Sequence, residues 1–236
     1  WWEKISATGA AASCWGPEVT TLRRLAQRPF PPRHGPNDPQ KTDRPGGQRR
    51  VRLVLYNLGV RGDGLERLSA RLEREVGCRG ELRRQQPQGI LLGIGLNDSA
   101  RVGRCDGRPQ LDPEGFLFGL EQLLPLARRM APVFVIGLTP VNNDAMPYAD
   151  VLWYQLDDIR RYERLLEEAC LEADVPFLPL LDGLLADPDW PSWLCSDGLH
   201  LNSDGHRQIY ERLRRWPALL QWAGLEQLNL GTPSAL

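Results

Sequence analysis

The sequence predicts an α/β fold, a three-layer α/β/α sandwich in which helices cover both faces of a parallel sheet. Short apolar runs alternate with amphipathic segments from Val51 onward. The runs are apolar at consecutive positions rather than at every second one, which indicates strands buried on both faces. At 236 residues the chain is also long enough to bury a sizeable core in one domain.

Four apolar runs are the expected strands. They cover residues 51–56, 89–95, 132–139 and 175–180. The fourth run contains Pro176 and Pro179, and because proline cannot donate to a strand ladder, we expect this strand at an edge of the sheet.

Four amphipathic segments are the expected helices, over residues 64–76, 112–129, 148–173 and 203–215. In the first, three leucines and Val76 recur at spacings of three and four, as on one face of a helix. The second begins with Asp112-Pro113-Glu114, which has proline in the first turn and acids at the positive end. Pro217 is expected to kink or break the last helix.

Residues 1–50 differ in composition from the rest of the chain. They contain seven prolines and no apolar run, and residues 1–52 hold ten Lys and Arg against four Asp and Glu. Such a composition predicts a poorly ordered segment, with a short helix over residues 19–27 as its one expected element. We therefore expect an atypical segment over residues 1–50, an α/β domain over 51–225 and a tail over 226–236.

Bulk properties narrow the function classes. The net charge of −1 gives no steering toward nucleic acid or an anionic membrane surface. The five cysteines are odd in number, scattered and without metal-ligand spacing, which favours a reduced, cytoplasmic setting. The sequence contains neither an apolar stretch of membrane-spanning length nor a signal pattern, and we expect a cytoplasmic protein.

Three short motifs with polar side chains follow expected strands or precede the last helix. They are Asn-Leu-Gly-Val-Arg-Gly-Asp over residues 57–63, Gly-Leu-Asn-Asp over 95–98, and Asp197-Gly-Leu-His200. Ligands of parallel sheets bind beyond the carboxyl ends of the strands, so these motifs are expected on one rim. An Asp three residues before a His can hold one imidazole nitrogen, while the other takes a proton from a nucleophile. With Asn97 as a donor to an oxyanion, the pattern indicates acyl transfer.

With these three motifs in this order, residues 51–225 resemble the SGNH hydrolases, the GDSL-type esterase and lipase superfamily. The resemblance implies a flavodoxin-like parallel sheet and ester hydrolysis through an acyl-enzyme, with neither a metal nor an organic cofactor. It implies that the backbone N–H of Gly62 and the side-chain amide of Asn97 stabilise the oxyanion. It also implies that His200 is the general base and later the acid, and that Asp197 orients it.

The nucleophile of that family is not found where the resemblance places it. The family carries it in a Gly-Asp-Ser motif at the end of the first strand, and this chain has no Gly-Asp-Ser. Upstream of Val51 the serines are Ser6 and Ser13, of which Ser6 is the better spaced, although no apolar strand leads into it. Loss of that central strand would leave unpaired backbone groups that cost about 1–3 kcal/mol each. The initial Trp and the abrupt change at Val51 lead to the hypothesis that residues 1–50 arose by a frameshift or belong to a gene fragment.

We predict a serine-type esterase that hydrolyses small carboxylic esters, lysophospholipid-like acyl esters or acetylated sugars. The alternative is a catalytically inactive, truncated or frameshifted protein that keeps the fold and lacks the nucleophile. A third hypothesis, that the basic residues from Arg23 to Arg52 bind nucleic acid, has no recognised motif behind it. Nearby polar residues have expected structural roles, with Asp98 orienting a loop and His206 supporting the last helix.

Overall fold

A parallel sheet of three strands forms the middle layer of the computed structural model, which describes residues 56–78 and 87–225. The strands are β1 (Ile90–Leu92), β3 (Val133–Ile136) and β5 (Phe177–Leu178), in the order β1-β3-β5. Ile90 pairs with Val133, and Val135 pairs with Phe177. Among the described strands β5 lies at an edge of this sheet, as its prolines predicted.

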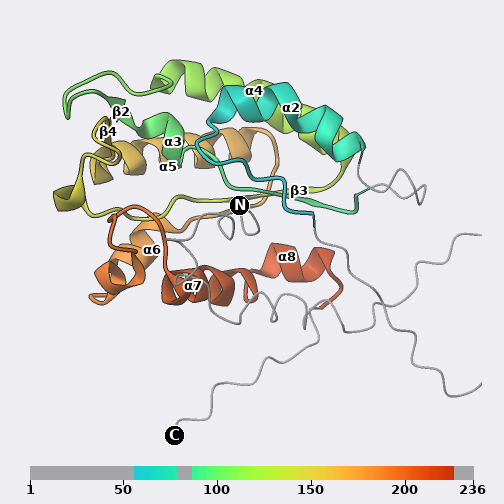
Figure 1. The fold of residues 1–236 in the computed structure, drawn as a ribbon. Coiled ribbons are helices and arrows are strands. Elements are labelled where there is room, and N and C mark those ends of the chain that lie inside the picture. The colour runs from blue at the N-terminus through green and yellow to red at the C-terminus, as the bar shows by residue number, and fades with distance from the viewer. Residues whose placement is uncertain (1–55, 79–86, 226–236) are drawn as a thin grey trace, which may run out of the picture.

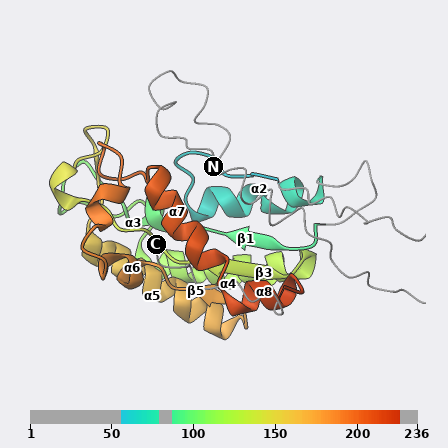
Figure 2. The same ribbon diagram turned by 90° about the horizontal axis from the view of Figure 1, so that it is seen from below.

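Helices cover both faces of the sheet, so the predicted three-layer α/β/α sandwich is confirmed (Figure 1). On one side lie α2 (Leu65–Gly77), α3 (Leu96–Ser99), α4 (Pro113–Met130) and α5 (Leu156–Glu172). On the other side lie α6 (Leu181–Leu185), α7 (Ser203–Leu213) and α8 (Pro217–Trp222). In Figure 2, α7 lies in front of the sheet. Two short 3₁₀ helices, η4 (Asn143–Ala145) and η5 (Trp190–Trp193), lie in the connections.

The core has one part on each face of the sheet. Under α2, α4 and α5 it includes Leu65 and Phe116, both almost completely buried. Against α7 and α8 it includes Phe134, Ile209 and Trp216, and the rings of Phe134 and Trp216 meet edge to face with centroids 5.6 Å apart. Because burying one large apolar side chain is worth about 1.5–3 kcal/mol, these two clusters hold the helices on the sheet.

Two predicted helix ends are confirmed by their local contacts. The side chain of Asp112 accepts a hydrogen bond of 2.8 Å from the N–H of Gly115, and Pro113 occupies the first turn of α4. Near the C-terminus, α7 ends at Leu213 and α8 begins at Pro217. Proline lacks the N–H that a continuous helix requires, so it starts a new helix here instead of continuing the old one.

The predicted helix over residues 148–173 is wrong at its beginning, because α5 begins only at Leu156. The preceding residues form a turn and the strand β4 (Leu152–Trp153), which pairs antiparallel with β2 (Arg101–Val102). Ala149 and Asp150 have φ values of 50° and 61°, which a right-handed helix cannot accommodate. Pairing with β2 therefore outweighs the local helical pattern.

Several predicted elements lie outside the described residues. They are the helix over residues 19–27, the strand over 51–56 apart from Tyr56, and the C-terminal tail over 226–236. The same is true of Ser6 and Ser13. The boundary expected at Val51 thus remains a prediction.

Candidate active site

The Asp197–His200 motif forms a direct side-chain pair in the loop that precedes α7. The Nδ1 atom of His200 lies 2.7 Å from Oδ2 of Asp197. The other carboxylate oxygen accepts hydrogen bonds from the backbone N–H groups of Leu199 and His200, at 3.0 and 2.9 Å. Because an ionised carboxylate only accepts, Nδ1 carries the proton and Nε2 is the basic nitrogen of the neutral ring.

The same hydrogen bonds keep Asp197 ionised. Burial by itself raises the pKa of Asp197, but hydrogen bonds from the His200 ring and from the N–H groups of His200 and Leu199 outweigh it. Together they lower the pKa of Asp197 to about 2. At neutral pH the carboxylate can therefore stabilise a positive charge that develops on His200.

Gly198 allows this loop to pack against the connection that follows β3. Its φ is +67°, and a Cβ atom at this position would lie 2.4 Å from the side chain of Ala145. Its carbonyl accepts a hydrogen bond of 2.8 Å from the N–H of Asn142. A larger residue would meet both backbone strain and a collision, so glycine fixes the position of the loop that carries His200.

Asn97 is held on the one-turn helix α3, directly after β1. Its side-chain amide donates a hydrogen bond of 2.9 Å to the carbonyl of Asp63, and its Oδ1 accepts one of 3.1 Å from the hydroxyl of Tyr154. Tyr154 is 1% exposed, and burial raises its pKa to about 12, so it remains a protonated donor. The hydroxyl therefore fixes which way the amide points, with its N–H groups directed to the loop that contains Gly62.

The loop over residues 57–63 is held by two carboxylates. Asp63 accepts a hydrogen bond of 2.8 Å from Arg71, and the same guanidinium donates to the carbonyl of Leu58 at 2.6 Å. Asp98 accepts one of 2.8 Å from the N–H of Leu65, at the beginning of α2. These contacts place Gly62, whose φ is +76°, one residue before the carbonyl that Asn97 contacts.

Two side-chain contacts in series link the loop over residues 57–63 to the loop that carries His200. Arg61 donates a hydrogen bond from Nη2 to the hydroxyl of Tyr148. The ring of Tyr148 meets the imidazole of His200 edge to face, with centroids 5.5 Å apart. The structure thus brings Gly62 and Asn97 together on one rim and connects them to His200 through two side chains.

A comparison with family models identifies the family of this chain. The model of the GDSL-like lipase/acylhydrolase family matches residues 26–208. The chain belongs to that family. A curated relative, the GDSL esterase/lipase WDL1 of Oryza sativa subsp. japonica, is 22% identical over 156 residues. The match covers 59% of this chain and 59% of the relative, so the chain spans about three fifths of that protein's length.

Solved structures show the same fold as this GDSL-like chain. The lipase/acylhydrolase from Enterococcus faecalis superposes with a TM-score of 0.53 at 19% identity, over 65% of this chain and 70% of that one. A structure described as a GDSL-like lipase from Parabacteroides merdae gives 0.50 at 19% identity, over 72% and 73%. At these identities the likeness concerns the fold alone.

Sequence reasoning missed three residues at the site of this GDSL-like chain. Tyr148 and Tyr154 come from a segment that was expected to be part of a helix. Arg71 lies within the predicted helix over residues 64–76, whose pattern does not distinguish it. The signal that could have found the tyrosines is the pair of segments that form β2 and β4, since a hairpin brings its flanking residues back to one place. These strands are two residues each, too short for a periodic pattern.

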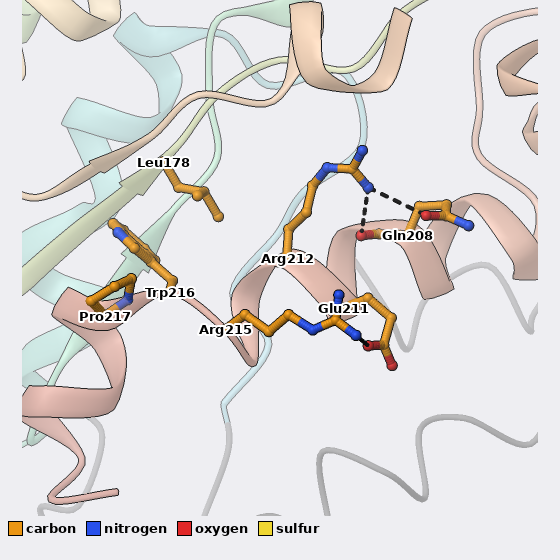
Figure 3. Close-up of a pocket in the computed structure, with 7 residues that line it drawn as sticks. All are labelled: Leu178, Gln208, Glu211, Arg212, Arg215, Trp216 and Pro217. Atoms are coloured by element: carbon orange, nitrogen blue, oxygen red, sulfur yellow. Dashed lines mark hydrogen bonds and ion pairs between the residues drawn. The ribbon is translucent and has the colours of Figure 1, made fainter. Parts of the chain in front are cut away.

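A separate cavity lies away from this rim. It has a volume of about 440 Å³ and lies between β5, α7 and α8 (Figure 3). Its described lining consists of Leu178, Gln208, Glu211, Arg212, Arg215, Trp216 and Pro217. Arg212 and Arg215 are both engaged there, with Gln208 and Glu211 respectively (Figure 3). None of the candidate active-site residues lines it.

Two further findings concern only the described part of the chain. There, no group of three or more His, Cys, Asp or Glu side chains is arranged to hold a metal ion. Within the same ranges, none of the helices has the length and apolar character needed to cross a membrane.

Because the pKa of His206, in α7, is lowered, we expect the stability of the fold to depend on pH. Burial, followed by the charge of His200, lowers the pKa of His206 to about 4. Between about pH 6.5 and about pH 4 the unfolded chain therefore takes up a proton here that the folded chain does not. We expect the free energy of unfolding to fall as the pH drops through this window, and to fall less steeply in His206→Gln. Urea unfolding of both proteins across the window measures this, and two parallel pH curves would contradict it.

Proposed function

We propose that this chain is a carboxylic ester hydrolase that acts through an acyl-enzyme formed on a serine. His200 is the general base, Asp197 orients it, and Gly62 and Asn97 donate to the oxyanion. The observation that carries the proposal is the 2.7 Å contact between His200 and Asp197, one tyrosine ring away from the loop of Gly62. The domain responsible would be the one expected over residues 51–225.

The reaction runs in two displacements. The serine oxygen attacks the ester carbonyl while Nε2 of His200 takes its proton, and Asp197 stabilises the resulting imidazolium. The negative charge on the former carbonyl oxygen is met by the backbone N–H of Gly62 and the amide of Asn97. His200 then gives the proton to the leaving alcohol as the C–O bond breaks. Water repeats the sequence on the acyl-enzyme and releases the carboxylic acid.

The proposed substrates are small carboxylic esters, with lysophospholipid-like acyl esters and acetylated sugars in the same chemical class. The proposed location is the cytoplasm, on the cysteine usage of the sequence. The nucleophile is unassigned, and Ser6, the better spaced serine upstream of the Gly62 loop although no apolar strand leads into it, is the candidate to test. A second candidate function, an inactive protein with the hydrolase fold, is favoured by one specific observation, which is the absence of Gly-Asp-Ser from the sequence.

Covalent labelling separates these two functions. The full chain is incubated with 4-nitrophenyl acetate and, separately, with a fluorophosphonate that modifies activated serines, and the labelled peptide is located by mass spectrometry. An active serine takes up the label, and Ser6 is the nucleophile where turnover and label are both lost in Ser6→Ala and retained in Ser13→Ala. Turnover that survives when Ser6→Ala and Ser13→Ala are combined would show that the nucleophile is another residue. Absence of both turnover and label would establish the inactive protein.

Replacement of Asn97 by alanine tests the proposed oxyanion donor. We expect kcat to fall by about 10²–10³-fold, as for loss of one oxyanion donor, with little change in KM. Tyr154→Phe, which removes only the hydroxyl that orients the amide, should give a smaller loss. Steady-state kinetics with 4-nitrophenyl acetate measures both, and circular dichroism checks that the variants fold. A rise in KM of that size for Asn97→Ala, with kcat unchanged, would rule out the proposed role.

A further inference from the structure

Arg61 places a positive charge beside the candidate active site. It is exposed and directly precedes Gly62, on the loop that is proposed to stabilise the oxyanion. Its guanidinium reaches across to the hydroxyl of Tyr148, whose ring contacts the imidazole of His200. The charge is therefore held at a defined place, one aromatic ring away from the proposed general base.

No carboxylate neutralises this charge among the residues that the structure describes. Arg71 and Arg101, by contrast, form ion pairs with Asp63 and Asp158 respectively. Arg61 forms none of the ion pairs recorded within residues 56–78 and 87–225.

The loop that carries Tyr148 also contains acidic residues. Asp144 and Asp150 are both exposed, and neither forms a recorded ion pair with Arg61.

A guanidinium has five N–H donors, and one of those of Arg61 is used by Tyr148. The remaining donors can form the paired hydrogen bonds that carboxylates and phosphates accept.

The position of Arg61 relative to His200 indicates which part of a substrate would meet it. In ester hydrolysis the general base returns its proton to the leaving alcohol, so the alcohol lies on the side of His200. Arg61 is joined to that side through Tyr148. A group on the acyl side would instead extend away from the imidazole.

We propose that Arg61 binds an anionic group, a carboxylate or a phosphate, in the alcohol part of the ester substrate. The inference rests on the proposed ester hydrolysis and names the substrate class of that site. Arg61 would thus determine specificity, with Tyr148 holding its guanidinium in place. Because the site is open to solvent, the preference should weaken as salt is added.

Matched acetyl esters test the inference. Both 4-acetoxybenzoate and 4-acetoxybenzamide transfer an acetyl group and release similar phenols, but only the benzoate carries a negative charge on the phenol part. We expect kcat/KM to favour the benzoate, and the ratio of the two values to fall about tenfold in Arg61→Gln. Arg61→Lys should retain part of the preference. Arg74→Gln makes the same charge change at an exposed position of α2 and should leave the ratio unaltered. In a further arm, 4-acetoxyphenyl phosphate distinguishes phosphate from carboxylate as the preferred anion.

An equilibrium measurement keeps this inference separable from the proposed function. Titration calorimetry compares 4-hydroxybenzoate with 4-hydroxybenzamide in the wild type and in Arg61→Gln, and needs no turnover. A preference for the benzoate that is lost in the variant supports the anion site, even if no ester is hydrolysed and the proposed function fails. Hydrolysis of both esters with a ratio that Arg61→Gln does not change would overturn the anion site and leave the esterase proposal standing.

Discussion

Replacing His200 with alanine is expected to lower kcat for 4-nitrophenyl acetate by about 10⁶-fold, the scale on which removal of the base of a serine triad acts. In the proposed mechanism the variant can neither take the serine proton nor return it to the leaving alcohol, while the proposed oxyanion donors stay in place. Asp197→Asn should produce a smaller loss of about 10⁴-fold, because the amide would favour the wrong tautomer of the ring. The measurement is steady-state kinetics on each variant.

The double variant shows whether the two residues work as a unit. Since His200 acts only when it is oriented by Asp197, the combined loss should equal the larger single loss rather than the product of both. Asp157→Asn is the matched control, because Asp157 is almost fully exposed on α5, and its kcat should stay within about twofold of the wild type. Independent, multiplicative losses would show that the 2.7 Å contact between Asp197 and His200 has no catalytic role.

Much of the fold could be predicted because its layers follow from apolar runs of local sequence. The apolar run around Ile90 and the one around Val133 favour strands, and Asp112 with Pro113 marks a helix start by its own capping contacts. The beginning of α5 could not be predicted in this way. It depends on pairing between β2 and β4, which are fifty residues apart in the chain and carry no local signal.

The candidate site divides in the same manner. Asp197 and His200 are three residues apart, so their contact is local, and Asn97 could be placed at the end of a strand by its sequence context. Their supports are contributed from a distance. Tyr154 reaches Asn97 across 57 positions and Tyr148 reaches Arg61 across 87, which only the folded chain makes adjacent.

Glu163 also makes contacts with residues far away in the sequence. Of the changes considered, its removal should lower the free energy of unfolding most. Glu163 lies on α5 and is only 8% exposed. One of its oxygens accepts hydrogen bonds from the N–H groups of Leu138, Leu180 and Leu181, at 3.0, 2.9 and 3.1 Å. A single carboxylate thus ties the chain after β3 to the chain after β5, at the rim where the site lies.

We expect Glu163→Leu to lower the free energy of unfolding by at least about 3 kcal/mol. The leucine leaves three buried N–H groups without an acceptor, and each costs about 1–3 kcal/mol. Glu163→Gln keeps a carbonyl oxygen at this position and should lose less. Glu167→Leu, on an exposed position one turn further along α5, should stay within about 0.5 kcal/mol of the wild type.

Urea unfolding of the three variants measures these differences, and a loss below about 1 kcal/mol in Glu163→Leu would contradict the assigned role. The distinction matters for the site because a typical domain is stable by only about 5–15 kcal/mol. A loss of the expected size would loosen the ends of β3 and β5 together, and the loop carrying Asn142 and Tyr148 starts from the first of these. Weaker esterase activity in Glu163→Leu at temperatures where Glu163→Gln remains active would therefore follow from the strand ends and not from any contact with substrate.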